Sequence, residues 1–355
     1  MSHSSAARTG SWELHEADAI GLLAGMPARS VDAVVTDPPY GIGFRDEPWD
    51  NAHNGSKGFE DWTRTWAEEC LRVLKPGGYM VAFGAPRTAH RLAAGVEDAG
   101  FEVRDQLLWL YGSGVPKGRL VDGRSSTLKP AYEPILLARA PLEGTHADTE
   151  ARWGTGRLGI DDARITTADT APGRWPCNVT LSHAPRCQPR RCTSACVVRV
   201  LDRSRPKIQP SRFFYCAKAS RRERDIGCER LPARSAPVYG LGGLKARRNT
   251  HPTVKPVELM RWLIRLVCPP GGLVLDPFAG SGTTGIAALR EGRRFLGVER
   301  EREYVRIAKA RLAHIAEQAR QAGVSGERLD GRPVTGTRGG SGRRQAIHDP
   351  SRKEG

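Results

Sequence analysis

The fold of this chain is decided by the stretch Leu275-Asp276-Pro277-Phe278-Ala279-Gly280-Ser281-Gly282-Thr283-Thr284. It joins an apolar run over 273–275, which predicts a buried strand, to a helical pattern over 283–290. Glycines in such a turn let the backbone approach a bound ligand closely, and Asp276 at the strand end can accept from an ammonium group. A strand, a glycine-rich turn and a helix in this order favour an α/β fold with a mostly parallel, Rossmann-like sheet and helices on both faces.

A carboxylate closes the next predicted strand. The apolar run 295–298 ends at Glu299, and an acid at the end of the second strand is placed to accept hydrogen bonds from both ribose hydroxyls of a nucleoside cofactor. Two interpretations of the turn stay open at this point. Gly280 to Gly285 also satisfies the G-x-G-x-x-G pattern of nicotinamide-dependent oxidoreductases.

A second motif, Asp37-Pro38-Pro39-Tyr40, follows another predicted buried strand over 31–36. In a parallel sheet both strand ends open on the same edge, where ligands bind, so the two loops are expected to face one crevice. Consecutive prolines withhold two amide donors and leave carbonyl acceptors. The Asp37 carboxylate and the Pro38 carbonyl can take the two protons of an amino group on an aromatic ring, and Tyr40 offers a face for base stacking.

The pattern along the chain divides it into five parts. Residues 11–142 alternate strand-like and helix-like runs, including a helix over 60–74 that Lys75-Pro76-Gly77-Gly78 stops before a strand over 79–83. Periodicity fades over 143–249, which is predicted to be an irregular, basic recognition insertion. The alternation resumes over 250–322 and ends in a helix with apolar residues from Tyr304 to Ile315 on one face. The remaining parts, 1–10 and 323–355, are predicted to be disordered tails, the second of them basic.

Composition points to a polyanionic partner. The chain has 355 residues, 39% of them hydrophobic, with a formal net charge of +16. Surplus Lys and Arg displace counterions from phosphates, so nucleic acid is the leading candidate, although basic ribosomal, membrane-surface and merely soluble proteins share this charge. Residues 1–10 lack the apolar segment of a secretory signal, and nowhere does an apolar run reach the roughly 20 residues that span a bilayer. We therefore expect a cytoplasmic protein without a membrane partner.

The two motifs together resemble those of the amino-group DNA methyltransferases, which act on N6 of adenine or N4 of cytosine. The resemblance implies that residues 37–40 bind the target amine and that Phe278, Gly280 and Gly282 bind S-adenosylmethionine. It also implies cofactor contacts from Thr253 and Lys255 in the segment 250–256, and from Asp18 near the cofactor's adenine. The order of the motifs, with the cofactor motif last, resembles the circularly permuted beta class.

The sulfonium is already a good methyl donor, so we expect direct in-line transfer to a base that is flipped out of double-stranded DNA, and a homodimer is a candidate assembly. Carbon-5 cytosine methylation is disfavoured, because it needs a thiolate nucleophile and Pro176-Cys177 lies inside the insertion. Asp at position 37 favours adenine, with N4 of cytosine as the alternative. An RNA or protein-glutamine methyltransferase, an oxidoreductase and a non-enzymatic DNA-binding protein are the further alternatives.

Four residues of the insertion have the chemistry of zinc ligands: His183, Cys187, Cys192 and Cys196. Thiolates and imidazole suit tetrahedral Zn²⁺, and four protein ligands would make the site structural rather than catalytic. A few free thiols and a surface histidine are the alternative. Basic and aromatic residues of the same region, among them Arg224, are expected to hold DNA phosphates and fill the gap left by a flipped base.

Overall fold

The computed structural model describes residues 11–44, 47–51, 55–111, 120–121, 124–125, 128, 130–167, 170–182, 187, 192–194, 196–204, 219–237 and 244–325. Within these ranges, every helix is too short or too polar to cross a membrane.

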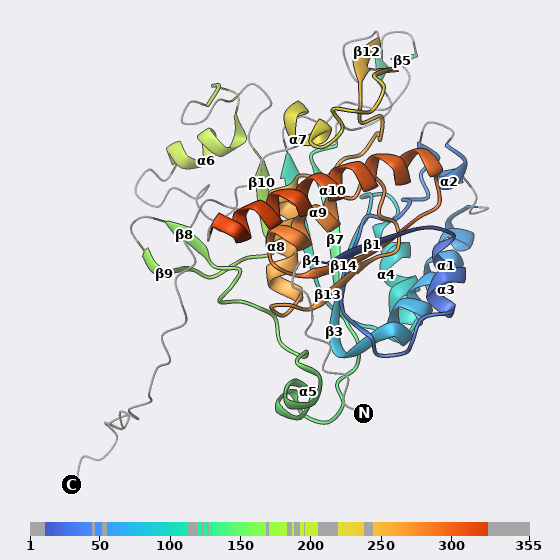
Figure 1. Ribbon diagram of the computed structural model, residues 1–355, viewed down its shortest axis with the longest axis vertical. Helices are drawn as coiled ribbons and strands as arrows, with labels where there is room; N and C mark the ends of the chain where they lie inside the picture. Colours follow the sequence, from blue (N-terminus) through green and yellow to red (C-terminus); the bar gives the residue numbers. More distant parts are fainter. Residues whose placement is uncertain are drawn as a thin grey trace.

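The molecule is built around one eight-stranded sheet (Figure 1). Its strands in spatial order are β1 (Trp12–Glu16), β14 (Arg294–Glu299), β13 (Leu273–Asp276), β2 (Val31–Thr36), β3 (Leu74–Phe83), β7 (Tyr132–Arg139), β4 (Glu102–Tyr111) and β10 (Val179–Ser182). Only the two pairings of β7 are antiparallel, and the other neighbouring pairs of this sheet are parallel. The mostly parallel sheet is therefore confirmed.

Helices cover both faces, as expected. One face packs against α1 (Ala19–Ala24), α3 (Gly55–Val73) and α4 (Ala89–Asp98), and the other against α8 (Val257–Val267), α9 (Thr283–Arg290) and α10 (Arg302–Ser325). Side chains of β2 alternate between the two layers: Val34 belongs to the core beneath α3, whereas Ala33 and Val35 belong to the core beneath α8. Both cores consist mainly of apolar side chains, so the sheet is a firm support for the loops at its edge.

Local signals predicted most element bounds well. The strand β2 and the helix α9 have the predicted ends, and α3 begins five residues before the predicted Glu60 and ends at Val73. The glycine and proline stop after α3 lies inside β3, where the pairing with β2 shifts from Val31↔Leu74 to Ala33↔Tyr79. Residues 75–78 therefore form a bulge within β3, and the strand begins at Leu74 instead of the predicted residue 79.

The predicted character of the insertion is wrong in one important respect. Its residues Val179–Ser182 form β10, which pairs in parallel with β4 and extends the central sheet. The short strand contains too few residues for a period-2 pattern to stand out from its neighbours. The other elements of this region are small: α5 (His146–Trp153), β8 (Ile165–Thr167), β9 (Thr170–Arg174), α6 (Val197–Ser204), α7 (Arg221–Asp225), β11 (Arg234–Pro237) and β12 (Leu244–Arg247).

Two further elements lie in the first part of the chain, α2 (Pro48–Asn51) and the hairpin of β5 (Leu120–Val121) and β6 (Arg124–Ser125). At the other end, α10 continues to Ser325, beyond the predicted start of the tail at 323. The predicted tails 1–10 and 326–355 lie outside the described residues.

Candidate active site

The functional residues gather at one edge of the sheet because of its topology. The parallel strands β1, β14, β13 and β2 all end there, at Glu16, Glu299, Asp276 and Thr36. Since β7 runs antiparallel to β3, with Phe83 opposite Ile135, the beginning of β7 reaches the same edge. Loops from both halves of the sequence therefore meet above the centre of the sheet.

The loop after β13 is held by its own carboxylate. Asp276 is 2% exposed. Its Oδ1 accepts from Thr36 Oγ1 at 2.7 Å and from the Phe278 amide at 3.1 Å, and its Oδ2 accepts from Thr284 Oγ1 at 2.6 Å. Burial raises the pKa of this carboxyl to about 7, against the lowering effect of these donors. We expected Asp276 to receive a ligand ammonium, but its oxygens instead bind β2, the loop and α9 together.

The two glycines of the loop have different neighbours. Gly280 has a φ of +51°, and a Cβ there would lie 2.7 Å from His251 Nε2. Gly282 has a φ of +76° and precedes α9, where a Cβ would lie 3.1 Å from Ala308 Cβ. Gly282 therefore permits close packing against α10, whereas Gly280 lines the cavity described below.

A buried arginine lies under the same loop. Arg311 of α10 is fully buried, and its Nη1 donates to the Ser281 carbonyl at 2.6 Å, to Ser281 Oγ at 3.0 Å and to Thr283 Oγ1 at 3.2 Å. Burial lowers the pKa of this guanidinium to about 10. Arg311 therefore fixes the Ser281 and Thr283 positions of the loop. Its place in an amphipathic helix gave no sequence signal for this contact.

Glu299 and Asp18 approach the loop from β14 and α1. Glu299 Oε2 accepts from the Gly280 amide at 2.8 Å and its Oε1 from the Glu301 amide at 2.7 Å. Burial raises the pKa of this carboxyl. The Arg300 amide also donates to this carboxylate, and because an ionised carboxylate has about four acceptor sites, acceptor capacity remains for a ligand hydroxyl. Asp18 caps α1 by accepting from the Gly21 amide at 3.2 Å.

A charged cluster surrounds Asp37 at the end of β2. The Nζ of Lys255 donates to Asp37 Oδ2 at 2.5 Å and to the Tyr40 hydroxyl at 3.1 Å, and lies 3.3 Å from Glu133 Oε2. The Tyr40 hydroxyl lies 2.8 Å from Asp37 Oδ1 and 3.1 Å from Glu133 Oε2. Two carboxylates thus share one ammonium group. We refer to Asp37, Tyr40, Glu133 and Lys255 as the Asp37 cluster.

Burial and charge act in opposite directions within this cluster. Burial raises the pKa of the Asp37 carboxyl, and Glu133 adds to that effect, although the Lys255 ammonium lowers it. Burial also disfavours the charge on Lys255, but the attraction of Asp37 and Glu133 raises its pKa above the ordinary value. Lys255 therefore stays charged, and the cluster has one negative charge more than positive when both acids are ionised.

This geometry changes the predicted role of Lys255. The resemblance assigned Lys255 to the cofactor, whereas its ammonium binds the residues expected to hold the amine. Glu133 was not predicted at all. The available signal was an acid two residues before the apolar run 135–138, but its relevance depended on β7 being antiparallel.

The backbone after Tyr40 is fixed by a second unpredicted acid. Asp50 of α2 is 2% exposed and accepts from the amides of Gly41 at 2.7 Å, Ile42 at 3.1 Å and Phe44 at 2.6 Å. Thr88 Oγ1 donates to the Tyr40 carbonyl at 2.7 Å. These contacts stabilise the loop in one conformation beside the Asp37 cluster.

Both motifs line one cavity of about 540 Å³. Among its walls are the predicted residues Asp18, Asp37, Pro38, Pro39, Tyr40, Thr253, Lys255, Asp276, Pro277, Phe278, Ala279, Gly280, Ser281, Thr283 and Glu299. Gly282 is not among them. The lining also includes aromatic, basic and acidic residues that sequence reasoning did not select: Phe44, Trp49, Trp62, Trp109, Glu133, His251 and Tyr304.

One basic residue of the insertion reaches this cavity. Arg224 of α7 lines it and donates through Nη2 to the His251 carbonyl at 2.8 Å. The adjacent Thr253 amide donates to His251 Nδ1 at 3.3 Å. Burial lowers the pKa of His251 to about 3, so this ring is neutral and can accept. The predicted basic and aromatic residues over 205–218 lie outside the described residues.

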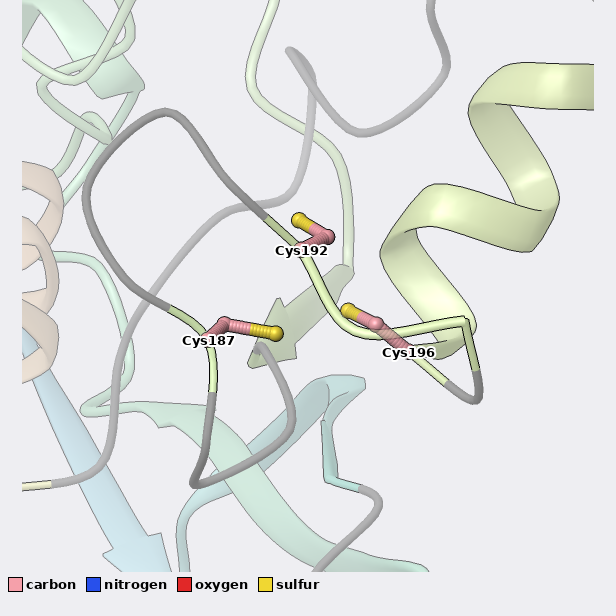
Figure 2. A group of neighbouring side chains, drawn as sticks. All are labelled: Cys187, Cys192 and Cys196. Atoms are coloured by element: carbon pink, nitrogen blue, oxygen red, sulfur yellow. The ribbon is translucent and has the colours of Figure 1, made fainter.

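Three cysteines of the insertion come together outside the lining of this cavity. The sulfur atoms of Cys187, Cys192 and Cys196 lie within 4.8 Å of one another (Figure 2). His183, predicted as the fourth ligand, lies outside the described residues. Cys70, Cys228 and Cys268 are buried separately, as expected for small apolar side chains.

Known proteins share both sequence and fold with this chain. A sequence profile of the DNA methylase family N6_N4_Mtase matches residues 31–310. The putative methylase YubD of Escherichia coli (strain K12) is 26% identical over 312 residues, covering 88% of this chain and 94% of that protein. The type II methyltransferase M.HpaI of Haemophilus parainfluenzae is 24% identical over 297 residues, covering 83% and 72%. The solved PvuII DNA methyltransferase (cytosine-N4-specific) has the same fold, with a TM-score of 0.54 at 18% identity over 92% of this chain and 95% of that one.

Proposed function

Since this chain belongs to the N6_N4_Mtase family of DNA methylases, we propose that it transfers a methyl group from S-adenosylmethionine to the N6 amino group of adenine in double-stranded DNA. Membership of this family removes the oxidoreductase interpretation of the glycine turn. The single observation that carries the proposal is that Asp37–Tyr40 and the loop 276–284 line the same cavity.

The order of the strands divides this cavity into two parts. Asp18, Glu299 and Asp276 follow or end β1, β14 and β13, which are consecutive in the sheet. Asp37 and Glu133 belong to the edge formed by β2, β3 and β7. A cofactor over β14 and β13 would therefore lie directly beside an amine held over β2.

The chemistry of the first part fits S-adenosylmethionine. The free acceptor sites of Glu299 suit ribose hydroxyls, the backbone at Gly280 has no side chain toward the cavity, and Asp18 adds an acceptor from α1. When bound, the cofactor supplies an electrophilic methyl group on a sulfonium. The volume of about 540 Å³ is within the usual range for a small-molecule site.

The Asp37 cluster supplies acceptors for the amine. An Asp37 oxygen and the Pro38 carbonyl accept hydrogen bonds from the two N–H groups of the amine, which turns the nitrogen toward the methyl donor. The Asp37 oxygen becomes available when the Lys255 ammonium shifts its hydrogen bond from Asp37 to Glu133. Glu133 Oε2 already lies 3.3 Å from Lys255 Nζ. The carboxyl of Asp37, with its raised pKa, then accepts the proton that the methylated nitrogen releases.

The substrate must expose a base that is stacked inside a duplex. We infer that the target base is flipped into the cavity, where aromatic rings such as those of Tyr40 and Trp109 offer stacking faces. Arg224 at the rim and the overall positive charge are suited to phosphates.

The test is incorporation of labelled methyl groups into duplex DNA, followed by digestion to nucleosides and mass spectrometry. We expect N6-methyladenine from the unaltered protein. Asp37→Ala should abolish transfer while retaining cofactor binding, and a matched surface variant, Asp61→Ala on the exposed face of α3, should retain both. Label in RNA or protein but not in DNA would overturn the proposal.

N4 of cytosine is the second candidate, because its amine presents the same two protons to the same acceptors. The solved relative named as cytosine-N4-specific has the same fold, so the fold is compatible with either base. Asp at position 37 supports adenine through the resemblance described above. Recovery of N4-methylcytosine in the same digestion would replace the adenine proposal.

A further inference from the structure

A second site lies in the segment that connects β10 to α6. The side chains of Cys187 and Cys196 point toward each other, Cys192 lies beside them, and Cys196 comes directly before the helix (Figure 2). None of the three is in a disulfide, and their sulfur atoms lie within 4.8 Å of one another. Cys196 is fully buried, and the other two are partly buried.

Hydrogen bonds between described residues hold the backbone around the thiols. The Cys196 amide donates to the Thr193 carbonyl at 3.1 Å, and Arg199 Nη1 of α6 donates to the Cys192 carbonyl at 3.0 Å. The local core has three fully buried members, Leu181 of β10, Cys196 and Val198 of α6. Burial of so few apolar side chains contributes little free energy against the entropy of ordering the segment.

Three mutually close thiols favour a metal over a disulfide. A disulfide would join two of them at about 2.05 Å and leave the third unpaired. Tetrahedral Zn²⁺ has Zn–S bonds of about 2.3 Å, which places its sulfur ligands about 3.8 Å apart. Sulfur atoms within 4.8 Å need inward shifts of only about 1 Å to reach that arrangement. Thiolates are also the ligands that select Zn²⁺ over hard cations.

We propose that Cys187, Cys192 and Cys196 supply three thiolate ligands to one Zn²⁺ ion, which joins these three positions of the segment before α6, where Cys196 packs with Leu181 of β10. The site lies in a different region from the cavity and does not depend on the reaction. Coordination adds to the cohesion of a small core that consists of Leu181, Cys196 and Val198.

The experiment uses inductively coupled plasma mass spectrometry to measure zinc in the full-length protein. The protein is purified under reducing conditions without added metal. We expect about one equivalent per chain, falling below about one tenth in the double variant Cys187→Ser/Cys192→Ser. Cys177→Ser is the matched control, because Cys177 lies in the same region, is partly buried and is outside the cluster. It should keep the full equivalent.

A second measurement separates loss of metal from loss of fold. Cobalt added to metal-free protein should give the thiolate-to-cobalt absorption band in the unaltered chain and in the control, but not in the double variant. Circular dichroism should show that all three proteins are folded. The proposal is overturned if folded, reduced protein holds no zinc and gives no such band, or if the double variant keeps its metal.

Discussion

Lys255 is the residue on which the electrostatics of the candidate site depend. Its ammonium lies between Asp37 and Glu133, and it is only 8% exposed. A buried carboxylate without a partner costs several kcal/mol, so two of them at this edge require the shared positive charge. In the proposed mechanism this contact loosens when an amine binds, and Lys255 then acts as a positioning residue for Asp37.

The first prediction concerns the pH dependence of transfer. Lys255→Met removes the charge that lowers the pKa of Asp37, so the acid limb of the rate profile should move upward by about one to two pH units. Glu133→Gln removes a charge that raises this pKa and should move the limb downward. Single-turnover rates between about pH 5 and 9 measure both. Shifts in the same direction for the two variants would contradict the shared-ammonium arrangement.

The second prediction concerns Gly280. Gly280→Ala combines a positive φ with a Cβ 2.7 Å from His251 Nε2, so the loop must move. We expect the affinity for S-adenosylmethionine, measured by calorimetry, to fall at least about tenfold, equivalent to about 1.4 kcal/mol. Gly292→Ala is the control, since it has a φ of +66° with open space around its Cβ. Equal losses in the two variants would show that backbone strain alone is responsible.

At the scale of the elements, the sequence predicted the bounds of individual strands and helices better than it predicted which strands pair. The bounds of β2 and α9 follow from contiguous apolar runs and turn residues, and they were predicted correctly. The pairing of β10 with β4, the reversed direction of β7 and the burial of Arg311 depend on partners far along the chain. Short-range periodicity contains no information on such partners. Glu133 was missed for that reason, although the loops on β2 and β13 were identified.

The third prediction tests the link between β2 and β13. Thr36→Val removes a donor from buried Asp276 with little change in shape, and should lower the free energy of unfolding by roughly 1.5–3 kcal/mol. Thr65→Val removes an exposed hydroxyl on α3 that donates to the Asp61 carbonyl. This control should change the free energy of unfolding by less than about 0.5 kcal/mol. Urea unfolding measures both.

The pKa of Asp276 sets the sign of the pH effect in this variant. Because its folded-state pKa is raised from 3.8 to about 7, its contribution to stability decreases as the pH rises through that window. Above it the carboxylate is charged and needs the Thr36 donor most. The cost of Thr36→Val should therefore be larger at about pH 8.5 than at about pH 5.5. A cost that does not vary with pH would contradict the charge assigned to Asp276.

At the scale of the whole molecule, charge determines how the enzyme meets DNA. The net charge of +16 predicts that binding to duplex DNA weakens steeply with salt. The logarithm of the binding constant should fall by about 0.9 for each phosphate contacted when the salt concentration rises tenfold. Fluorescence anisotropy across salt concentrations measures this slope. The affinity for S-adenosylmethionine, set by enclosed contacts, should vary much less. A DNA affinity independent of salt would contradict the electrostatic interpretation.

The pairing of β2 with β13 also has a consequence for synthesis of the protein. Ala33 lies opposite Val274, and Thr36 bonds Asp276, 240 residues later in the chain. Closing so long a loop costs entropy that must be spent before the contacts form, which slows folding. During translation, β2 cannot pair with β13 until the ribosome has synthesised β13 and that segment has left the exit tunnel. A partly made chain therefore lacks the loop after β13 that lines the cavity, and the cavity is complete only after residues 273–284 have been synthesised.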